Sequence, residues 1–268
     1  MLDVHWYPEA RGWLCDSVGG YYKARITTDS WAAPSGCTGT STLHQARMAA
    51  PRSLWDPTYS EDSWIQLDVG GPIRLIPRLK DVVASKYPGT AIAITEYYYG
   101  GAGYISGAVA QADLLGIFGR EGVFAANFWP NARTSQYTVP SAAYACALPA
   151  FQVYLDYDGA GSGFGDLSAL TTGGDAARAS AFASVRSADD GKVIVVAINK
   201  STVSLTASLR IRHTGTLTDA RLFRLGPYGA WTDPGCTGPS AAGTAIVPFV
   251  NALVVSLPAT SVTVVELR

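Results

Sequence analysis

The sequence predicts an α/β region followed by an all-β region, and three observations support this. Strand and helix patterns alternate from residue 2 to residue 154, which favours a parallel sheet with helical crossovers. Residues 159–175 are rich in Gly, Ser and Asp, as expected of a linker or crossing loop. Short runs of alternating β-branched residues then recur between turn signals, a pattern typical of a β-sandwich. We therefore expect one domain over residues 1–160 and a β-sandwich domain over residues 161–268.

The first region shows three strand patterns and three helix patterns. Residues 2–7 alternate as a strand that Pro8 ends, and residues 11–63 form a long, weakly periodic excursion, a feature that is usually functional in compact enzymes. Pro72 suits the first turn of the helix that follows. The remaining elements expected here cover residues 72–87, 91–95, 106–118, 122–129 and 141–154.

The second region is predicted to consist of short strands alone. They cover residues 179–187, 193–199, 203–212, 217–225, 245–249, 252–257 and 262–267.

Composition excludes several classes of protein. With 48% hydrophobic and 15% charged residues, the chain is globular rather than disordered. Its net charge of −1 and lack of a basic cluster argue against nucleic acid or an anionic membrane as partner. No apolar run is long enough to span a membrane, and the first residues do not form a signal peptide.

The four cysteines do not have the spacing of a metal site. Cys15 and Cys37 lie in one polar, Gly-rich region and can pair in an oxidising compartment. Cys146 lies in an apolar helical pattern, so we expect it to be a small buried residue.

Glu96 is the strongest functional candidate. It follows the short apolar strand 91–95, at the carboxyl end where barrels and open α/β sheets keep their active sites. Three tyrosines and two glycines follow it directly. A carboxylate among aromatic rings is a candidate for sugar chemistry, whereas the alternative is a solvated or Arg-paired carboxylate at a strand end. Six of the seven tryptophans and thirteen of the fourteen tyrosines also precede residue 158.

Four long segments of the sequence resemble glycoside hydrolase family 44, and the resemblance covers nearly the whole chain. They are LDVHWYPEA (2–10), SLWDPTYSEDSW (53–64), ITEYYYGG (94–101) and AQADLLGIFGREGV (110–123). The resemblance implies strands six to eight of a (β/α)8 barrel, followed by a β-sandwich. It also implies retaining cleavage of β-1,4-glucans such as cellulose derivatives or xyloglucan, with xylan as a further candidate, and an extracellular full-length enzyme.

The same resemblance assigns site residues. Glu96 matches the family's nucleophile, on the seventh barrel strand. The residues implied in substrate contact are His5, Tyr7, Trp55, Trp64, Tyr98 and Trp129. Tyr98 departs from the Asn found in many relatives, which puts the local hydrogen bonding to sugar hydroxyls in doubt. The tryptophans could also be core residues, although Trp64 and Trp129 flank element ends rather than apolar registers.

The second catalytic carboxylate is missing from the pattern. Retaining hydrolysis needs a nucleophile and an acid/base about 5 Å apart, and the family's acid is a Glu that follows an Asn, a pair absent here. We therefore expect the chain to be the carboxyl-terminal part of a longer enzyme. The isolated polypeptide should be poorly stable or associate, because it leaves a strand edge and a barrel interior uncovered, and it should not hydrolyse glucans.

Cofactor signals are weak. Asp3 and His5 form a D-x-H pair that could ligate a metal, although a His that hydrogen-bonds substrate or Glu96 is the better interpretation. Asp156, Asp158 and Asp166 could gather around calcium, whereas turn capping is the ordinary role of such residues. No cofactor is required by the expected chemistry.

A different class of function competes with hydrolysis. A non-catalytic carbohydrate-binding protein would keep the aromatic residues and need no acid/base pair. Glycines 101, 103 and 107 only faintly resemble a phosphate loop, since their spacing is too long, and no G-x-S-x-G motif is present.

Overall fold

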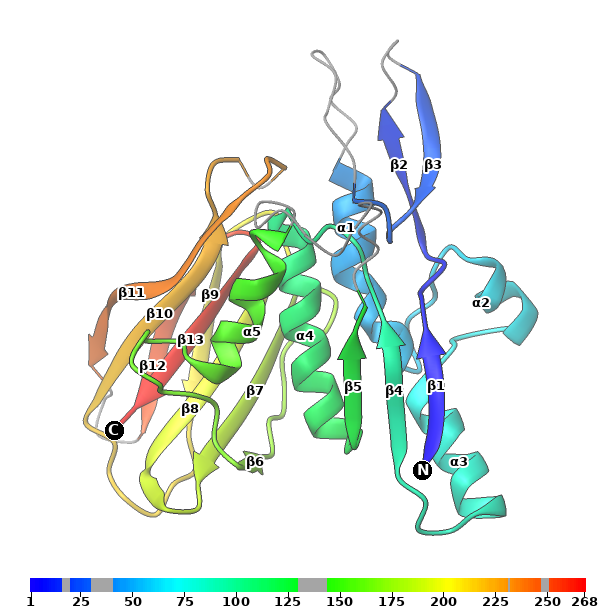
Figure 1. The fold of residues 1–268 in the computed structure, drawn as a ribbon. Helices are drawn as coiled ribbons and strands as arrows, with labels where there is room; N and C mark the ends of the chain where they lie inside the picture. Colours follow the sequence, from blue (N-terminus) through cyan, green and yellow to red (C-terminus); the bar gives the residue numbers. More distant parts are fainter. Residues whose placement is uncertain (16–19, 30–40, 130–143, 231, 247–250) are drawn as a thin grey trace.

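A computed structural model describes residues 1–15, 20–29, 41–129, 144–230, 232–246 and 251–268. It contains a parallel sheet with helices followed by antiparallel sheets, as the sequence predicts (Figure 1). Every helix in this described part is too short or too polar to cross a membrane.

Three strands form the parallel sheet in the order β1-β4-β5. They are β1 (Leu2–Trp6), β4 (Ile92–Tyr97) and β5 (Ala125–Phe128). The helix α3 (Leu75–Lys86) precedes β4, and α4 (Ile105–Glu121) connects β4 to β5. Because the strands are parallel, their carboxyl ends meet at one edge of the sheet, where Glu96 lies.

The excursion after β1 is more regular than its weak periodicity predicts. It holds the hairpin β2 (Arg11–Cys15) and β3 (Tyr21–Arg25), then α1 (Ser41–Ala49), the 3-10 helix η1 (Ala50–Leu54) and α2 (Trp64–Val69). Gly12 makes the hairpin possible, because a Cβ there would lie 2.4 Å from the Cα of Leu43. Tertiary packing on α1 therefore specifies these elements.

Two antiparallel sheets form the β-sandwich. The larger has the order β11-β10-β13-β8-β7-β6 and the smaller pairs β12 with β9. The strands are β6 (Leu167–Ala169), β7 (Ala179–Arg186), β8 (Asp189–Asn199), β9 (Leu205–Arg210), β10 (Asp219–Pro227), β11 (Cys236–Ile246), β12 (Ala252–Leu257) and β13 (Ser261–Leu267).

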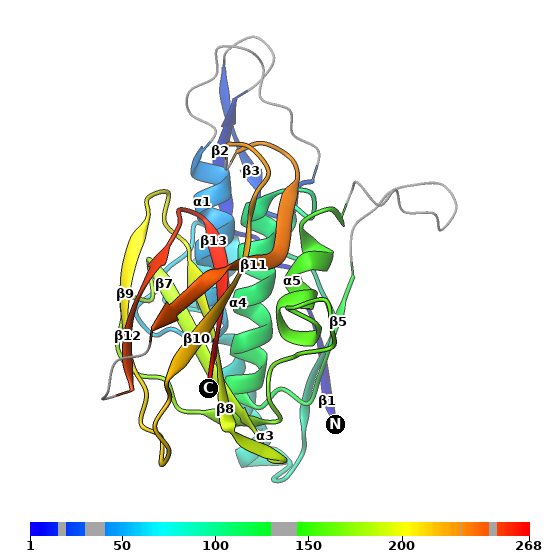
Figure 2. The same cartoon turned by 90° about the vertical axis from the view of Figure 1, so that its left-hand side faces the viewer.

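The helix α4 lies between the parallel sheet and the β-sandwich (Figure 1), and Figure 2 shows the β-sandwich side of the same arrangement. Its residues share one core with Ile94 of β4 and with Ile194 and Val196 of β8. The intervening Val193 and Val195 face the other way, into the core between the two sandwich sheets. The strand β8 is therefore buried on both faces, which explains its continuous apolar run.

Three details differ from the sequence prediction. The helix α3 begins at Leu75, so Pro72 precedes its first turn. The helix α5 (Ala147–Leu155) begins later than predicted, and residues 141–143 lie outside the described residues. The predicted strand at 245–249 overlaps the last two residues of the longer β11, whose Gly- and Ser-rich beginning carries no strand pattern, and residues 247–249 lie outside the described residues.

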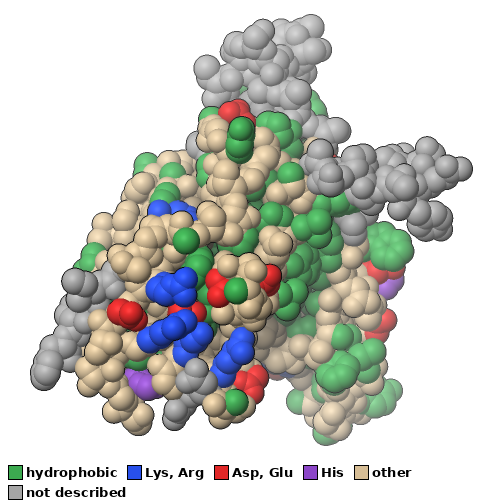
Figure 3. All heavy atoms as spheres, turned by 60° about the vertical axis from the view of Figure 1, so that its left-hand side comes forward, with side chains coloured by type: hydrophobic (Ala, Val, Ile, Leu, Met, Phe, Trp, Pro, Cys, Tyr) green, Lys and Arg blue, Asp and Glu red, His purple; other side chains and the backbone are tan. Residues whose placement is uncertain are grey.

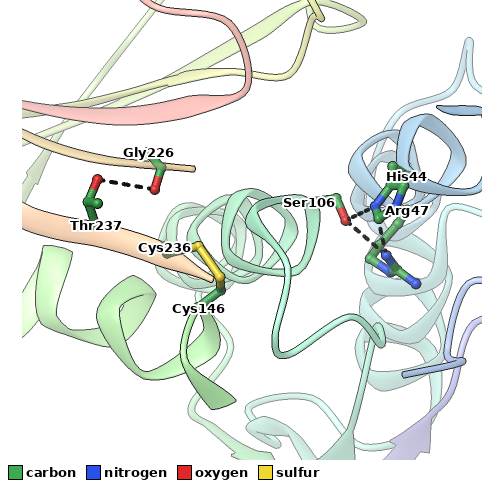
Figure 4. The surroundings of a disulfide bond; sticks show 7 residues. All are labelled: His44, Arg47, Ser106, Cys146, Gly226, Cys236 and Thr237. Carbon is green, nitrogen blue, oxygen red and sulfur yellow. Dashed lines mark hydrogen bonds between the residues drawn. A yellow bond between two sulfur atoms is a disulfide. The ribbon is translucent and has the colours of Figure 1, made fainter. Parts of the chain in front are cut away.

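Cys146 is buried, as expected, but it forms a disulfide with Cys236, 90 residues later (Figure 4). The predicted burial of Cys146 is confirmed, and the disulfide is a feature that the sequence pattern did not predict. The bond joins the start of α5 to the start of β11. Cys37 lies outside the described residues, so its pairing with Cys15 stays a prediction.

The parallel sheet has two open edges among the described residues. Both β1 and β5 pair only with β4. Asp3 and His5 of β1 are exposed, as is Asn127 of β5. These edges motivate the expectation that the isolated chain associates or is poorly stable, which stays a prediction.

Candidate active site

Glu96 lies at the carboxyl end of β4, the central strand of the parallel sheet. It pairs in register with His5 of β1, and both strand pairings around it contain a register shift. Local shifts of this kind re-aim side chains next to active sites. The Glu96 side chain is 29% exposed, so solvent and a ligand can reach it.

Two side chains from the end of β1 hold the Glu96 carboxylate by one oxygen. The Tyr7 hydroxyl donates to Oε2 over 2.9 Å, and His5 Nδ1 lies 3.2 Å from the same atom. Burial, and then the hydrogen bond and negative charge of Glu96, raise the pKa of Tyr7 to about 12. Tyr7 therefore stays protonated and keeps donating at any physiological pH.

The other carboxylate oxygen, Oε1, accepts no hydrogen bond from any described residue. One oxygen is thus anchored, and the second has no partner among the described residues. A carboxylate that attacks an anomeric carbon requires this combination of a fixed orientation and an unoccupied oxygen.

The three tyrosines after Glu96 do not line the open side of the site. The Tyr97 ring packs edge-on against Phe118, and its hydroxyl accepts from Gln111. The Tyr99 hydroxyl accepts from the Trp6 indole. Tyr98 is only 2% exposed and donates to Asp29. The Tyr98 hydroxyl thus has a partner inside the protein, and its expected substrate contact stays a prediction that this burial does not favour.

Trp129 and Trp64 lie at the same end of the parallel sheet as Glu96. The Trp129 amide donates to the Tyr97 carbonyl, and its side chain is 57% exposed. Trp64 begins α2, next to Asp62, whose carbonyl accepts from Arg11 in the hairpin that follows β1. Both remain candidates for contact with a substrate.

Trp55 lies at the opposite end of the sheet. Its ring stacks under the Arg120 guanidinium, 4.1 Å from the ring centroid, in the last turn of α4. The chain then turns into β5, where Phe124 bonds to Ile92 at the beginning of β4. Trp55 thus makes a packing contact away from Glu96, and its expected substrate contact stays a prediction that this position does not favour.

The other four glutamates make their contacts away from Glu96. Glu9 pairs with Arg25, and Glu121 pairs with Lys80 beyond the end of α4. Glu61 is buried beside Ser53. Burial raises its pKa, although hydrogen bonds from serines oppose this. Among the described residues no contact joins Glu61 to Glu96.

Glu266 is enclosed within the β-sandwich. The Tyr157 hydroxyl donates to it over 2.6 Å, and Lys192 and Arg268 pair with it at 3.3 and 2.7 Å. Figure 3 shows Lys and Arg side chains gathered over this part of the molecule. Although burial alone raises its pKa, these partners lower it overall, so Glu266 is an ionised structural carboxylate.

The aspartates proposed for calcium cap separate turns. Asp156 accepts from the Gly161 amide and Asp158 from the amides of Ala160 and Ser162. Asp166 binds the amide and hydroxyl of Ser187 instead, and these bonds lower its pKa. Each of the three carboxylates accepts hydrogen bonds from its own turn and they do not converge on one point, so the geometry does not support a calcium site. No cluster of metal-ligating side chains occurs among the described residues. Asp3, of the D-x-H pair, accepts from Thr95.

Sequence reasoning missed the residues that hold the loop after β4. Arg47 of α1 is buried and donates to the carbonyls of Ile26, Thr28 and Tyr99 and to Ser106 (Figure 4). Asp29 accepts from the Gly101 amide. A Cβ at Gly101 would overlap the Arg47 guanidinium. The Gly100-Gly101 pair was the available signal, but its partners could not be read from sequence.

The chain is similar to known glucan-degrading enzymes, although no family model matches it. It is 39% identical over 231 residues to endoglucanase A of Paenibacillus lautus, covering 86% of this chain and 29% of that protein. It matches the family 44 endoglucanase Cel44A of Clostridium thermocellum with a TM-score of 0.80 and 35% identity, over 100% of this chain and 46% of that one. A Paenibacillus polymyxa xyloglucanase of family 44, solved with xyloglucan, matches with a TM-score of 0.80 and 33% identity, over 99% and 46%.

These relatives are glycoside hydrolases, and the likeness extends through both the parallel sheet and the β-sandwich. The comparisons identify this chain as similar to part of a glycoside hydrolase of family 44. It spans less than half the length of each of these relatives.

Proposed function

We propose that this chain carries the nucleophile of a retaining glycoside hydrolase that acts on β-1,4-glucans such as cellulose derivatives, xyloglucan and xylan. The observation that supports this most is the Glu96 carboxylate, held on Oε2 by Tyr7 and His5, while Oε1 has no partner in the described part of the chain. Oε1 attacks the anomeric carbon while the glycosidic oxygen leaves, and water later releases the sugar from the ester. His5, Tyr7, Trp64 and Trp129 form the substrate side of the site.

The leaving oxygen needs a proton from a second carboxyl group. We propose that this acid/base residue belongs to a part of the enzyme outside this chain, because all four other glutamates are engaged elsewhere. In this proposal β1, β4 and β5 are strands six to eight of a (β/α)8 barrel, within the domain over residues 1–160. The Cys146–Cys236 disulfide supports an extracellular enzyme.

A non-catalytic carbohydrate-binding protein is the second candidate for this chain by itself. No second glutamate contacts Glu96 among the described residues, and a protein that only binds carbohydrate would not need one. Such a protein would use Trp129 and Trp64, which are 57% and 58% exposed.

Two measurements on one preparation test the proposal. Electrophoresis in gels that contain soluble xyloglucan or hydroxyethylcellulose reports binding, and reducing-sugar release reports hydrolysis. We expect retardation without hydrolysis for this chain, and hydrolysis once the part with the acid is supplied. No retardation in any β-1,4-glucan would contradict a glucan-binding cleft.

A further inference from the structure

The hairpin β2–β3 presents an aromatic residue that the site at Glu96 does not use. Trp13 is 45% exposed. It pairs across the hairpin with Lys23, whose Nζ lies 5.6 Å from the centroid of its ring. Apolar area left in water does not stabilise the fold, so this large exposed ring is a candidate for contact with a ligand.

Trp13 is continuous with the proposed substrate side of the site. Lys23 Nζ pairs with Asp62 Oδ2 at 2.5 Å. Asp62 lies two residues before Trp64, and its carbonyl accepts from Arg11 of the hairpin. Trp13, Lys23 and Asp62 are thus joined by direct contacts, and the exposed Trp64 follows Asp62 by two residues along the chain. We call these four residues the hairpin strip.

The backbone beneath the Trp13 ring is held in place. Its amide donates to Thr42 Oγ1 over 2.7 Å, and the Thr42 hydroxyl donates back to its carbonyl over 3.0 Å. Leu14 beside it is 1% exposed, and Gly12 packs directly on Leu43. The ring is thus carried on a fixed strand, so little order has to be gained when a ligand stacks on it.

The chemistry of the hairpin strip fits a neutral, polyhydroxylated ligand. The charges of Lys23 and Asp62 cancel, which disfavours a strongly acidic or basic partner. Indole faces pack against the C–H faces of sugar rings, and charged groups between them are strong hydrogen-bond partners for hydroxyls. We propose that the hairpin strip binds sugar residues of a β-glucan chain remote from Glu96, an inference that rests on the proposed function.

Isothermal titration of the whole chain tests this with a short cello-oligosaccharide and a long, soluble xyloglucan. Trp13→Ala should weaken binding of the long glucan by about 2- to 10-fold, the range measured for single aromatic contacts, and leave the short ligand unaffected. Lys23→Gln, which keeps the ring, should give a smaller loss for the long glucan only. Tyr87→Ala is the matched control, because Tyr87 is 71% exposed at the end of α3.

The outcomes separate the two proposals. If the wild type binds the long glucan and both Trp13→Ala and Lys23→Gln bind it equally well, the hairpin strip is not a glucan site and the proposed function is untouched. Equal losses for the short and the long ligand would also overturn the inference. A wild type that binds neither glucan overturns the proposed function together with this inference.

Discussion

The Glu96 carboxylate is anchored through a single oxygen, and the donor that anchors it is Tyr7. Replacing Tyr7 by Phe keeps the ring and removes only the hydroxyl. A hydrogen bond to a charged group contributes about 1.5–3 kcal/mol, so reaction of Glu96 with a glycosylating reagent should slow by about tenfold or more. Mass spectrometry of samples quenched at successive times measures the rate of labelling, and Tyr87→Phe is the control. An unchanged rate would show that Tyr7 does not position the nucleophile.

His44 gives the protein a defined sensitivity to acid. Burial, and to a smaller extent the charge of Arg47, lower the pKa of His44 to about 3. An unfolded histidine binds a proton below about pH 6.5, so between pH 6.5 and pH 3 the unfolded state binds more protons than the folded one. Stability is therefore complete above pH 6.5 and is lost as the pH falls through this window.

We expect this effect to cost about 2 kcal/mol of the free energy of unfolding between pH 7 and pH 5. Urea unfolding at the two pH values measures it. His44→Gln can still bond to Ser106 but does not titrate, so its stability should change less over the same interval. Equal pH dependence in both proteins would contradict a neutral, buried His44.

At the scale of elements, α4 is fastened to the β-sandwich by a buried ion pair. Lys200 Nζ lies 3.2 Å from Asp113 Oδ2, and the two side chains are 2% and 1% exposed. Lys200→Met leaves the Asp113 charge buried without its partner, which should destabilise the fold by about 3–5 kcal/mol. Urea unfolding measures the loss.

The half-exposed pair of Lys80 with Glu121 is the matched control. Lys80→Met should change the free energy of unfolding by less than about 1 kcal/mol, because exposed ion pairs contribute little. Similar effects of the two substitutions would mean that α4 does not depend on Lys200.

Elements with long, repetitive patterns could be predicted from the sequence, and elements specified by tertiary packing could not. The helix α4 and the buried strand β8 carry continuous apolar periodicity, and both are where the pattern predicts. The hairpin β2–β3 is fixed by Gly12 packing on α1, which no local pattern reports.

The site divides in the same way. Glu96 could be located because a strand end is a local feature. The surroundings of Trp55 and Tyr98 could not be predicted, because they depend on partners far along the chain, here Arg120 and Asp29. Spacing along the chain does not encode those contacts.

At the scale of the whole molecule, the Cys146–Cys236 disulfide closes a loop of 90 residues that includes most of the β-sandwich. A crosslink across a loop of this length stabilises by about 4 kcal/mol, mainly by restricting the unfolded chain. Dithiothreitol should therefore lower the urea midpoint of the wild type. The Cys146→Ser, Cys236→Ser double variant should unfold at a lower urea midpoint than the oxidised wild type, and the reductant should lower its midpoint by less than it lowers that of the wild type, because Cys15 is also disulfide-bonded. A wild type whose midpoint the reductant leaves unchanged would contradict this role.

The central assignment is that Glu96 is the nucleophile and that the acid/base residue lies outside this chain. A leaving group such as dinitrophenolate departs without a proton, and fluorine at C2 of the sugar slows hydrolysis of the glycosyl ester, so the adduct accumulates. The direct measurement is therefore peptide mass spectrometry of this chain after incubation with a fluorinated cellobioside that carries a dinitrophenyl group. We predict one cellobiosyl adduct on Glu96, absent in Glu96→Gln and retained in Glu121→Gln. An adduct on another residue, or no adduct in the folded wild type, would contradict the assignment.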